Sequence, residues 1–136
     1  MAYWLVKSEP AAFSWERLVR EGRAMWDGVR NYQARNNLKL MKKGDQVLFY
    51  HSNEGLEIVG LAQVAREFYP DPTAKDDPRW VVVDLVPIRP LKRPIGLQAI
   101  KKERGLKNMM LVRQSRLSVM PVTEFEFSEI LTLTSR

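Results

Sequence analysis

Four short segments of the sequence combine aromatic, small and polar residues at spacings that do not match those of a packed core. They are residues 4–10, 26–34, 50–52 and 115–119. Segments of this composition are typical of loops that join regular elements. Because loops carry binding and catalytic side chains more often than core elements do, these four segments are the candidates for chemistry.

Hydrolysis is one chemistry open to these segments, because five of their residues could combine a base with a nucleophile: His51, Ser52, Ser8, Glu9 and Asp27. The sequence has no nucleophile elbow, P-loop, glycine-rich dinucleotide fingerprint or zinc-binding pair of histidines. His51 also shares a strand face with Val47 and Phe49, a position typical of a partly buried histidine. We therefore expect binding rather than catalysis.

The elements that must position these segments include several strands. Strong β-formers predict strands over residues 3–7, 46–51, 57–65 and 80–86. The last of these is apolar enough to be buried on both faces. Pro87, Pro90 and Pro94 predict irregular backbone after it, and residues 108–113 and 117–119 are predicted to be extended.

Capping signals predict helices over residues 14–22, 31–40, 97–103 and 123–131. Ser14 and Asn31 can cap the first two with their side chains, and Thr123 forms a capping box with Glu126 for the last. The mixture of strands and short helices lacks the regular alternation of a doubly wound sheet. It therefore predicts an α+β fold in the form of a small barrel.

Composition bounds the class of protein. We expect residues 1–136 to form a single domain, because this length supports one hydrophobic core. The sequence has no cysteine and one histidine, His51, so we expect no disulfide, no metal and no cofactor. It shows no signal peptide and no membrane-spanning stretch, which favours a cytoplasmic protein without a membrane partner, and we expect a monomer.

The net charge of +6 is unevenly distributed. From Arg89 to Arg116 there are nine basic residues and one acid, Glu103, whereas the rest of the chain has thirteen basic and fifteen acidic residues. A local excess of this kind attracts polyanions, of which nucleic acid is the commonest. The alternative is a solvated basic surface that has no partner.

Six motifs together carry a resemblance to a known family. They are Lys7–Pro10, Trp26–Asn36, Met41–Asp45, Phe49–Ser52, Tyr69–Ala74 and Ser115–Val119. In order and distribution they resemble the EVE domain, a PUA-like family. The resemblance implies a PUA-like pseudobarrel of mixed, mainly antiparallel strands with short surrounding helices. It also implies a pocket for a nucleotide base, and recognition of modified bases such as 5-methylcytosine derivatives.

The residue types fit such a pocket. A nucleobase needs a flat surface to stack on, and the candidates for it are Trp4, Trp26, Tyr32 and Tyr50. Each of these aromatic residues could instead be an ordinary core residue.

The remaining residues of the predicted pocket surround the edge of the base: Ser8, Glu9, Asn31, His51, Leu117 and Ser118. Hydroxyl, amide and imidazole groups can both donate and accept hydrogen bonds. Glu9 could accept from an exocyclic amino group, as carboxylates do from cytosine, or be an ordinary surface carboxylate. Asn31 is also the predicted helix cap, a role that competes with ligand binding.

Phosphate contacts are predicted for four cations: Lys7, Arg30, Arg113 and Arg116. Arg30 could instead form a salt bridge with Asp27. The resulting hypothesis is that DNA or RNA docks along the basic segment and that one flipped or unpaired base enters the pocket. The alternative in another class is a sensor of free nucleosides, which would not need the basic segment.

Overall fold

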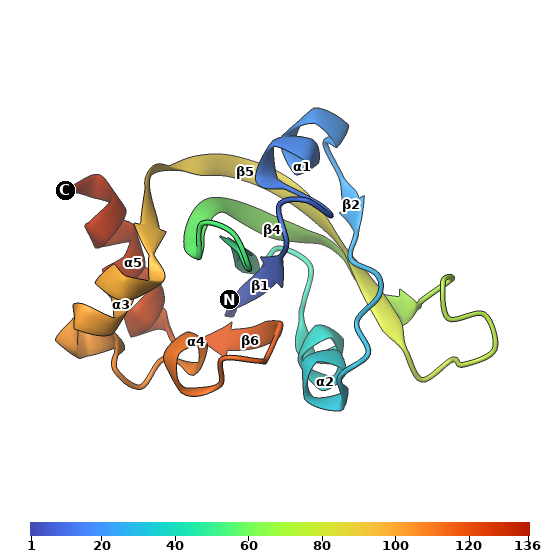
Figure 1. The fold of residues 1–136 in the computed structure, drawn as a ribbon. Coiled ribbons are helices and arrows are strands. Elements are labelled where there is room, and N and C mark those ends of the chain that lie inside the picture. Colours follow the sequence, from blue (N-terminus) through green and yellow to red (C-terminus); the bar gives the residue numbers. More distant parts are fainter.

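The computed structural model describes residues Met1–Arg136 and contains one six-stranded sheet in the order β2-β5-β4-β3-β1-β6 (Figure 1). The strands are β1 (Tyr3–Ser8), β2 (Ala24–Met25), β3 (Gln46–His51), β4 (Glu57–Pro70), β5 (Val81–Gly96) and β6 (Val119–Val122). β1 and β3 run parallel, and all other neighbouring strands are antiparallel. The predicted α+β fold of mixed, mainly antiparallel strands is confirmed.

Five short α-helices and one 3₁₀ turn surround the sheet. They are α1 (Trp15–Glu21), α2 (Tyr32–Leu40), α3 (Leu97–Lys102), η1 (Arg104–Leu106), α4 (Met110–Arg113) and α5 (Glu124–Ser135). Figure 1 shows α3 and α5 together at one end of the molecule, and α2 toward the other. No helix combines the length and the apolar character that a bilayer crossing requires.

The helix ends follow from their capping residues. The side chains of Ser14, Asn31 and Thr123 each accept a backbone N–H in the first turn of α1, α2 and α5, as predicted. Thr123 and Glu126 form the complete capping box. Gly22 ends α1 at a φ of +77°, a left-handed conformation that glycine adopts without a steric cost.

Two predictions for the second half of the chain are wrong. β5 continues through Pro87, Pro90 and Pro94. Pro87 and Pro90 lie opposite β4 where the pairing of the two strands shifts register. Proline is tolerated at such irregular positions, because its missing N–H is not needed for a regular hydrogen bond between the strands. Met110–Arg113 is a helical turn rather than extended, closed by bonds from Val112 and Arg113 N–H to the Met109 carbonyl.

The core is one cluster of 34 buried hydrophobic residues that reaches from β1 to α5. Phe49 on β3 is fully buried and makes edge-to-face contacts with the rings of Trp15 and Trp26, each with its centroid 5.5 Å from that of Phe49. Gly60 on β4 lies directly under the Trp15 ring, so close that a Cβ there would stand 2.5 Å from it. This packing fixes α1 and the segment after β2 against the sheet.

Candidate functional site

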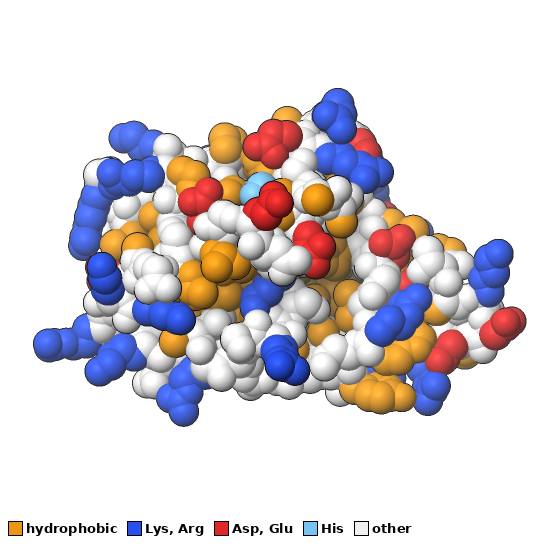
Figure 2. Space-filling view, in the orientation of Figure 1, with side chains coloured by type: hydrophobic (Ala, Val, Ile, Leu, Met, Phe, Trp, Pro, Cys, Tyr) orange, Lys and Arg blue, Asp and Glu red, His pale blue; other side chains and the backbone are white.

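Two adjoining cavities open beside the carboxyl ends of β1 and β3. The Trp26 cavity, of about 620 Å³, lies between α1, the segment from Arg23 to Arg30 and β1. The Tyr50 cavity, of about 490 Å³, lies between β1, the turn after β3 and the loop around Ser115. Lys7, Ser8 and Ser118 line both, so the two cavities form one depression. Basic and acidic side chains both surround the hollow on this face in Figure 2.

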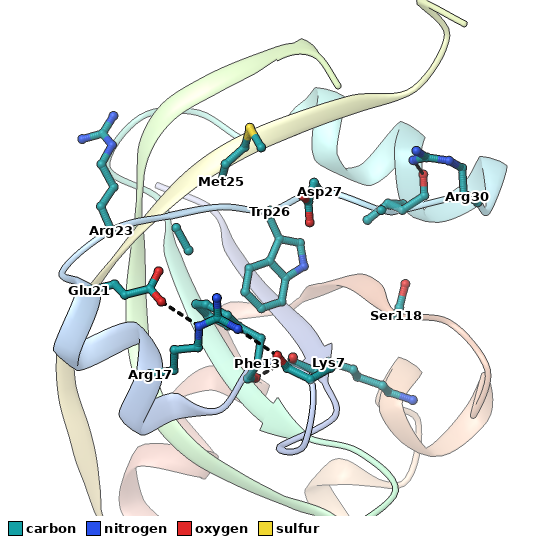
Figure 3. A pocket seen from close by; sticks show the side chains of 15 residues that line it. Lys7, Phe13, Arg17, Glu21, Arg23, Met25, Trp26, Asp27, Arg30 and Ser118 are labelled. Carbon is teal, nitrogen blue, oxygen red and sulfur yellow. Dashed lines mark hydrogen bonds and ion pairs between the residues drawn. The ribbon is translucent and has the colours of Figure 1, made fainter. Parts of the chain in front are cut away.

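The indole of Trp26 forms the apolar wall of its cavity. Its ring packs edge-on against Phe13, at 5.9 Å between centroids, and against Phe49. Its backbone N–H donates to the Val83 carbonyl of β5 at 2.8 Å. Figure 3 shows the indole in the middle of the cavity, between Asp27 and Phe13 and with Ser118 across from it. The ring is therefore held in one orientation, as a stacking surface must be.

Asp71 holds the loop that follows Trp26. Its side chain is fully buried and accepts from the Gly28 N–H at 3.1 Å, from Arg30 Nη1 at 3.0 Å and from the N–H and hydroxyl of Thr73 at 2.7 and 2.6 Å. Burial by itself raises the pKa of Asp71, but the bonds from Thr73, Gly28 and Arg30 outweigh it and hold the pKa below the ordinary 3.8. The carboxylate therefore stays ionised and fixes the Gly28–Arg30 backbone.

Lys7 is the cation at the junction of the two cavities. Its Nζ donates to the Ser115 carbonyl at 2.8 Å and lies 5.7 Å from the centroid of the Tyr50 ring. It forms no salt bridge with a carboxylate, and burial lowers its pKa from the ordinary 10.5. A partly buried cation without a counterion attracts an anionic ligand.

Ser8 and Ser118 form the rim shared by the two cavities. The Ser8 hydroxyl donates to the Phe13 carbonyl at 2.7 Å, and the Ser118 carbonyl accepts from the Lys7 N–H at 2.9 Å. The side chain of Ser118 remains without a protein partner. Glu9 is exposed and lines the Tyr50 cavity, where its carboxylate faces solvent. Five residues of the predicted base pocket thus line one depression: Ser8, Glu9, Trp26, Tyr50 and Ser118.

Five other residues of the predicted base pocket line neither cavity: Trp4, Asn31, Tyr32, His51 and Leu117. Trp4 and Leu117 belong to the core, and the indole N–H of Trp4 donates to buried Asp45 at 3.0 Å. His51 Nε2 accepts from the Trp15 N–H at 3.1 Å, so it serves to anchor α1.

The other two residues stand at the start of α2. Asn31 uses its side-chain oxygen to cap the helix by accepting from the Ala34 N–H at 2.9 Å, the role that competes with ligand binding. Tyr32 is half exposed, packs against the Trp80 ring and lines neither cavity.

Of the four predicted phosphate contacts, Lys7, Arg30 and Arg116 line the depression. Arg113 does not, and its guanidinium donates to Asn108 Oδ1 at 2.9 Å. Arg30 pairs with Asp71 rather than with Asp27, because the chain folds the segment after β4 back onto the Trp26 loop. Of the nine basic residues between Arg89 and Arg116, Arg116 alone lines either cavity.

Two lining cations, Arg17 and Arg23, were missed. Arg17 donates to Glu21 Oε2 at 2.6 Å and lies 4.9 Å from the centroid of the Phe13 ring. Arg23 forms a two-pronged bond to Asp84 of β5, at 2.9 and 3.1 Å. No signal in the sequence singles them out, since both resemble ordinary surface residues of a short helix and its exit. Asp27 also lines the Trp26 cavity. The sequence pointed to it only for hydrolysis and as a partner of Arg30, although its place in the 26–34 segment could have marked it as a pocket residue.

The comparison with known proteins identifies the family. The model of the EVE domain matches residues 2–133. The chain belongs to the EVE domain family. Thymocyte nuclear protein 1 of Mus musculus is 43% identical, over 96% of this chain and 73% of that protein.

Solved structures agree with the EVE domain assignment. Protein Atu2648 of Agrobacterium tumefaciens is 46% identical and superposes with a TM-score of 0.97, over 98% of this chain and 93% of that one. Human THYN1, in complex with DNA that contains 5-methylcytosine, is 37% identical with a TM-score of 0.96, over 100% and 99% of the two chains. The EVE domain fold implied by the sequence motifs is therefore confirmed.

Proposed function

We propose that this EVE domain binds nucleic acid and holds one modified base, of the 5-methylcytosine type, in the Trp26 cavity. The observation that carries the proposal is the likeness to human THYN1, whose structure is a complex with DNA containing 5-methylcytosine. The likeness extends over the whole chain and therefore includes every segment that lines the depression.

The wall of the Trp26 cavity suits a pyrimidine ring. Stacking of a base on an aromatic side chain contributes about 1 to 3 kcal/mol. A methyl group at position 5 of the base would add about 1 kcal/mol if it packed on apolar side chains such as Met25 and Val29, which also line the cavity. This energy corresponds to a preference of about fivefold over unmodified cytosine.

The polar groups around Trp26 suit the edge of cytosine. Cytosine presents an amino group that donates and a ring carbonyl that accepts. Asp27 is exposed, lies beside the indole and can accept from the amino group (Figure 3). The Ser118 hydroxyl, across the cavity, can donate to the carbonyl. Both assignments are part of the proposal.

Lys7 supplies the contact with the backbone of the nucleic acid. A phosphate beside its ammonium group would neutralise a charge that no protein carboxylate pairs. This favours a strand over a free nucleoside, which carries no phosphate. Arg116 lines the Tyr50 cavity together with Lys7 and would extend the contact along the strand.

We favour binding without catalysis. His51 Nε2 already accepts the Trp15 N–H, and the Ser8 hydroxyl donates to the Phe13 carbonyl. Neither Ser8 nor Ser52 forms a side-chain hydrogen bond with His51, the contact that would activate a serine nucleophile. The pocket would instead select one base by stacking, shape and desolvation.

The test is a pair of single-stranded DNAs that differ by one methyl group on a central cytosine. Fluorescence anisotropy should show tighter binding of the methylated strand by the wild type, by about fivefold. Trp26→Phe keeps an aromatic ring between Phe13 and Phe49 but reduces the stacking area, so it should weaken binding of both strands and reduce the preference.

Trp4→Phe is the matched control. It also shortens a buried tryptophan, but one that bonds to Asp45 and lines neither cavity. It should lower the thermal unfolding temperature and leave the methyl preference unchanged. Equal binding of the two strands by the wild type contradicts the proposal. Competition by free 5-methyl-2′-deoxycytidine as strong as that of the strand would favour the nucleoside sensor.

A further inference from the structure

A second group of aromatic and cationic side chains lies outside the depression. Tyr32, the first residue of α2, packs on Trp80 with ring centroids 5.1 Å apart and an interplanar angle of 31°. Arg30, Arg35 and Arg79 surround these two rings, and we call the five residues the arginine–aromatic cluster. It joins α2 to the loop between β4 and β5, which Figure 1 shows extending away from the sheet.

Guanidinium groups contact the two rings from several positions. The guanidinium carbon of Arg35 lies 5.1 Å from the Tyr32 centroid and 6.0 Å from that of Trp80. That of Arg30 lies 5.7 Å from the Trp80 centroid, and Arg79 Nη1 donates to the Tyr32 hydroxyl at 3.3 Å. A guanidinium that rests on an aromatic ring keeps its N–H groups in the plane of the fork, available to a planar or tetrahedral anion.

The charges of the cluster are not fully compensated. Arg30 pairs with Asp71, and Arg79 pairs with Asp77, whose pKa the Arg79 bond lowers to about 2. Arg35 has no carboxylate partner, and its guanidinium donates to Asn36 Oδ1 at 3.1 and 2.7 Å. One cation therefore remains free to bind an anion.

Tyr32 is more exposed than packing on Trp80 requires. The residue is 52% exposed, whereas Trp80 is 9% exposed. The capping of α2 is performed by Asn31, so the helix start does not depend on the tyrosine ring. An exposed ring beside an unpaired guanidinium is the combination with which proteins bind single-stranded nucleic acid, through base stacking and phosphate contact.

The cluster is continuous with the depression. Arg30 lines the Trp26 cavity and also lies over the Trp80 ring. Figure 3 shows its side chain at the edge of the cavity on the side of α2. A strand that places one base beside Trp26 and leaves the cavity past Arg30 would next meet Tyr32 and Arg35.

We propose that the arginine–aromatic cluster is a second contact site for the same nucleic acid strand. Tyr32 stacks on an unpaired base that flanks the recognised nucleotide, and Arg35 binds a phosphate of the flank. This inference rests on the proposed function, since the strand must first be held at the Trp26 cavity.

The test uses two single-stranded DNAs of equal length with a central 5-methylcytosine. In one, the flanking nucleotides are ordinary; in the other they are abasic, which removes the bases and keeps the phosphates. Tyr32→Ala should weaken binding of the ordinary strand about tenfold, within the range expected for one stacked base. On the abasic strand the same substitution should change binding less than about twofold, because the stacking partner is already gone.

Arg35→Gln tests the phosphate contact. It should reduce the slope of log K against log salt by about 0.7, the value for one phosphate of a single strand, on both strands. Tyr32→Ala should leave this slope unchanged.

Matched controls are Lys39, near the other end of α2, and Phe68 on β4. Phe68 is 45% exposed and has Lys39 Nζ 5.6 Å from its ring centroid, but it lies apart from the cavities. Phe68→Ala and Lys39→Gln should leave binding of both strands unchanged. Tyr32→Phe retains the ring and should bind like the wild type.

Equal losses for Tyr32→Ala on the ordinary and abasic strands would show a purely structural role and overturn the inference. Unchanged binding by Tyr32→Ala and Arg35→Gln would also overturn it. The proposed function fails separately if the wild type binds the methylated and unmethylated strands equally well. If the wild type binds neither strand, both proposals fail.

Discussion

At the scale of single residues, Lys7 combines a cost in stability with a role in binding. Burial lowers its pKa from 10.5, so the folded protein disfavours the charged form relative to the unfolded chain. The unfolded chain therefore holds more protons between the lowered pKa and 10.5, and the stability of the fold rises with pH through that window. At neutral pH the full cost of the buried charge is present.

Lys7→Met should therefore keep or raise the thermal unfolding temperature at pH 7. It should also weaken binding of the methylated strand about tenfold, because a charge-assisted contact with phosphate is lost. Affinity of the wild type should fall as the pH approaches the lowered pKa of Lys7. Anisotropy and thermal unfolding measure the two effects, with Lys39→Met as the exposed control. A variant that binds as well as the wild type would remove Lys7 from the site.

Residue type alone did not separate Trp4 from Trp26. Both are 9% exposed or less, and both belong to the aromatic and polar segments singled out in the sequence, residues 4–10 and 26–34. The difference is the neighbour of each ring: Trp4 donates its N–H to Asp45, whereas Trp26 borders the cavity. Asp45 is 41 residues from Trp4 in the sequence, so no local pattern could reveal the pair.

At the scale of elements, the loop after β4 is fixed to the Trp26 loop by one carboxylate. Asp71→Asn should lower the free energy of unfolding by about 2 kcal/mol, because charge-assisted bonds to Gly28, Arg30 and Thr73 are weakened. The pKa of Asp71 is lowered, so its contribution is complete above pH 3.8 and is lost as the pH falls through the folded pKa.

Urea unfolding across a pH series measures this effect. The difference between wild type and Asp71→Asn should be constant near neutral pH and shrink in acid. Asp77→Asn, at a partly exposed carboxylate of the same loop, should change stability little, because solvent screens its pair with Arg79. A difference that persists unchanged below the folded pKa would mean that the charge of Asp71 is not responsible.

The contact between β4 and α1 depends on a missing side chain. A Cβ at Gly60 would meet three atoms of the Trp15 ring at 2.5 to 2.6 Å, and that ring is backed by Phe49. Gly60→Ala should therefore cost about 2 kcal/mol in the free energy of unfolding through overpacking. Gly96→Ala is the control, because a Cβ there meets nothing within 4 Å. Equal unfolding midpoints for the two variants would show that α1 shifts at no cost.

At the scale of the whole molecule, the distribution of charge favours a docking path across the depression over one along the basic segment. Arg116 is the one basic residue of that segment that lines the depression, whereas the other lining cations, Lys7, Arg17, Arg23 and Arg30, come from the first half of the chain. Much of the predicted segment belongs instead to β5, α3 and η1, and Figure 1 shows α3 at the end of the molecule beside α5. Sequence proximity of charges thus did not imply one surface.

Salt dependence distinguishes docking of the strand across the depression from docking along the basic segment, residues 89–116. If Lys7, Arg116 and Arg35 each contact one phosphate, log K should fall with log salt at a slope of about −2. Replacing Lys101, Lys102, Arg104 and Lys107 together by glutamine should leave most of that slope. Lys7→Met with Arg116→Gln should remove about two thirds of it, since two of the three phosphate contacts are lost. The opposite result would restore docking along the basic segment.

The sequence by itself determined the family and most of the elements, although not the course of β5 through its prolines or the turn of α4. Caps at Ser14, Asn31 and Thr123 and the strand patterns were correct, because these signals act between residues a few positions apart. The EVE domain motifs also placed Lys7, Ser8, Trp26 and Ser118 among the site residues, and all four line the depression.

Only the tertiary structure decided which aromatic rings border a cavity and which cations are free. Trp4 and Leu117 are in the core, Arg30 pairs with Asp71, and β5 continues through its prolines. These outcomes depend on distant partners: Trp4 and its acceptor Asp45 are 41 residues apart in the sequence, as are Arg30 and Asp71. Burial and charge pairing are properties of such contacts, and a local pattern of residues does not contain them.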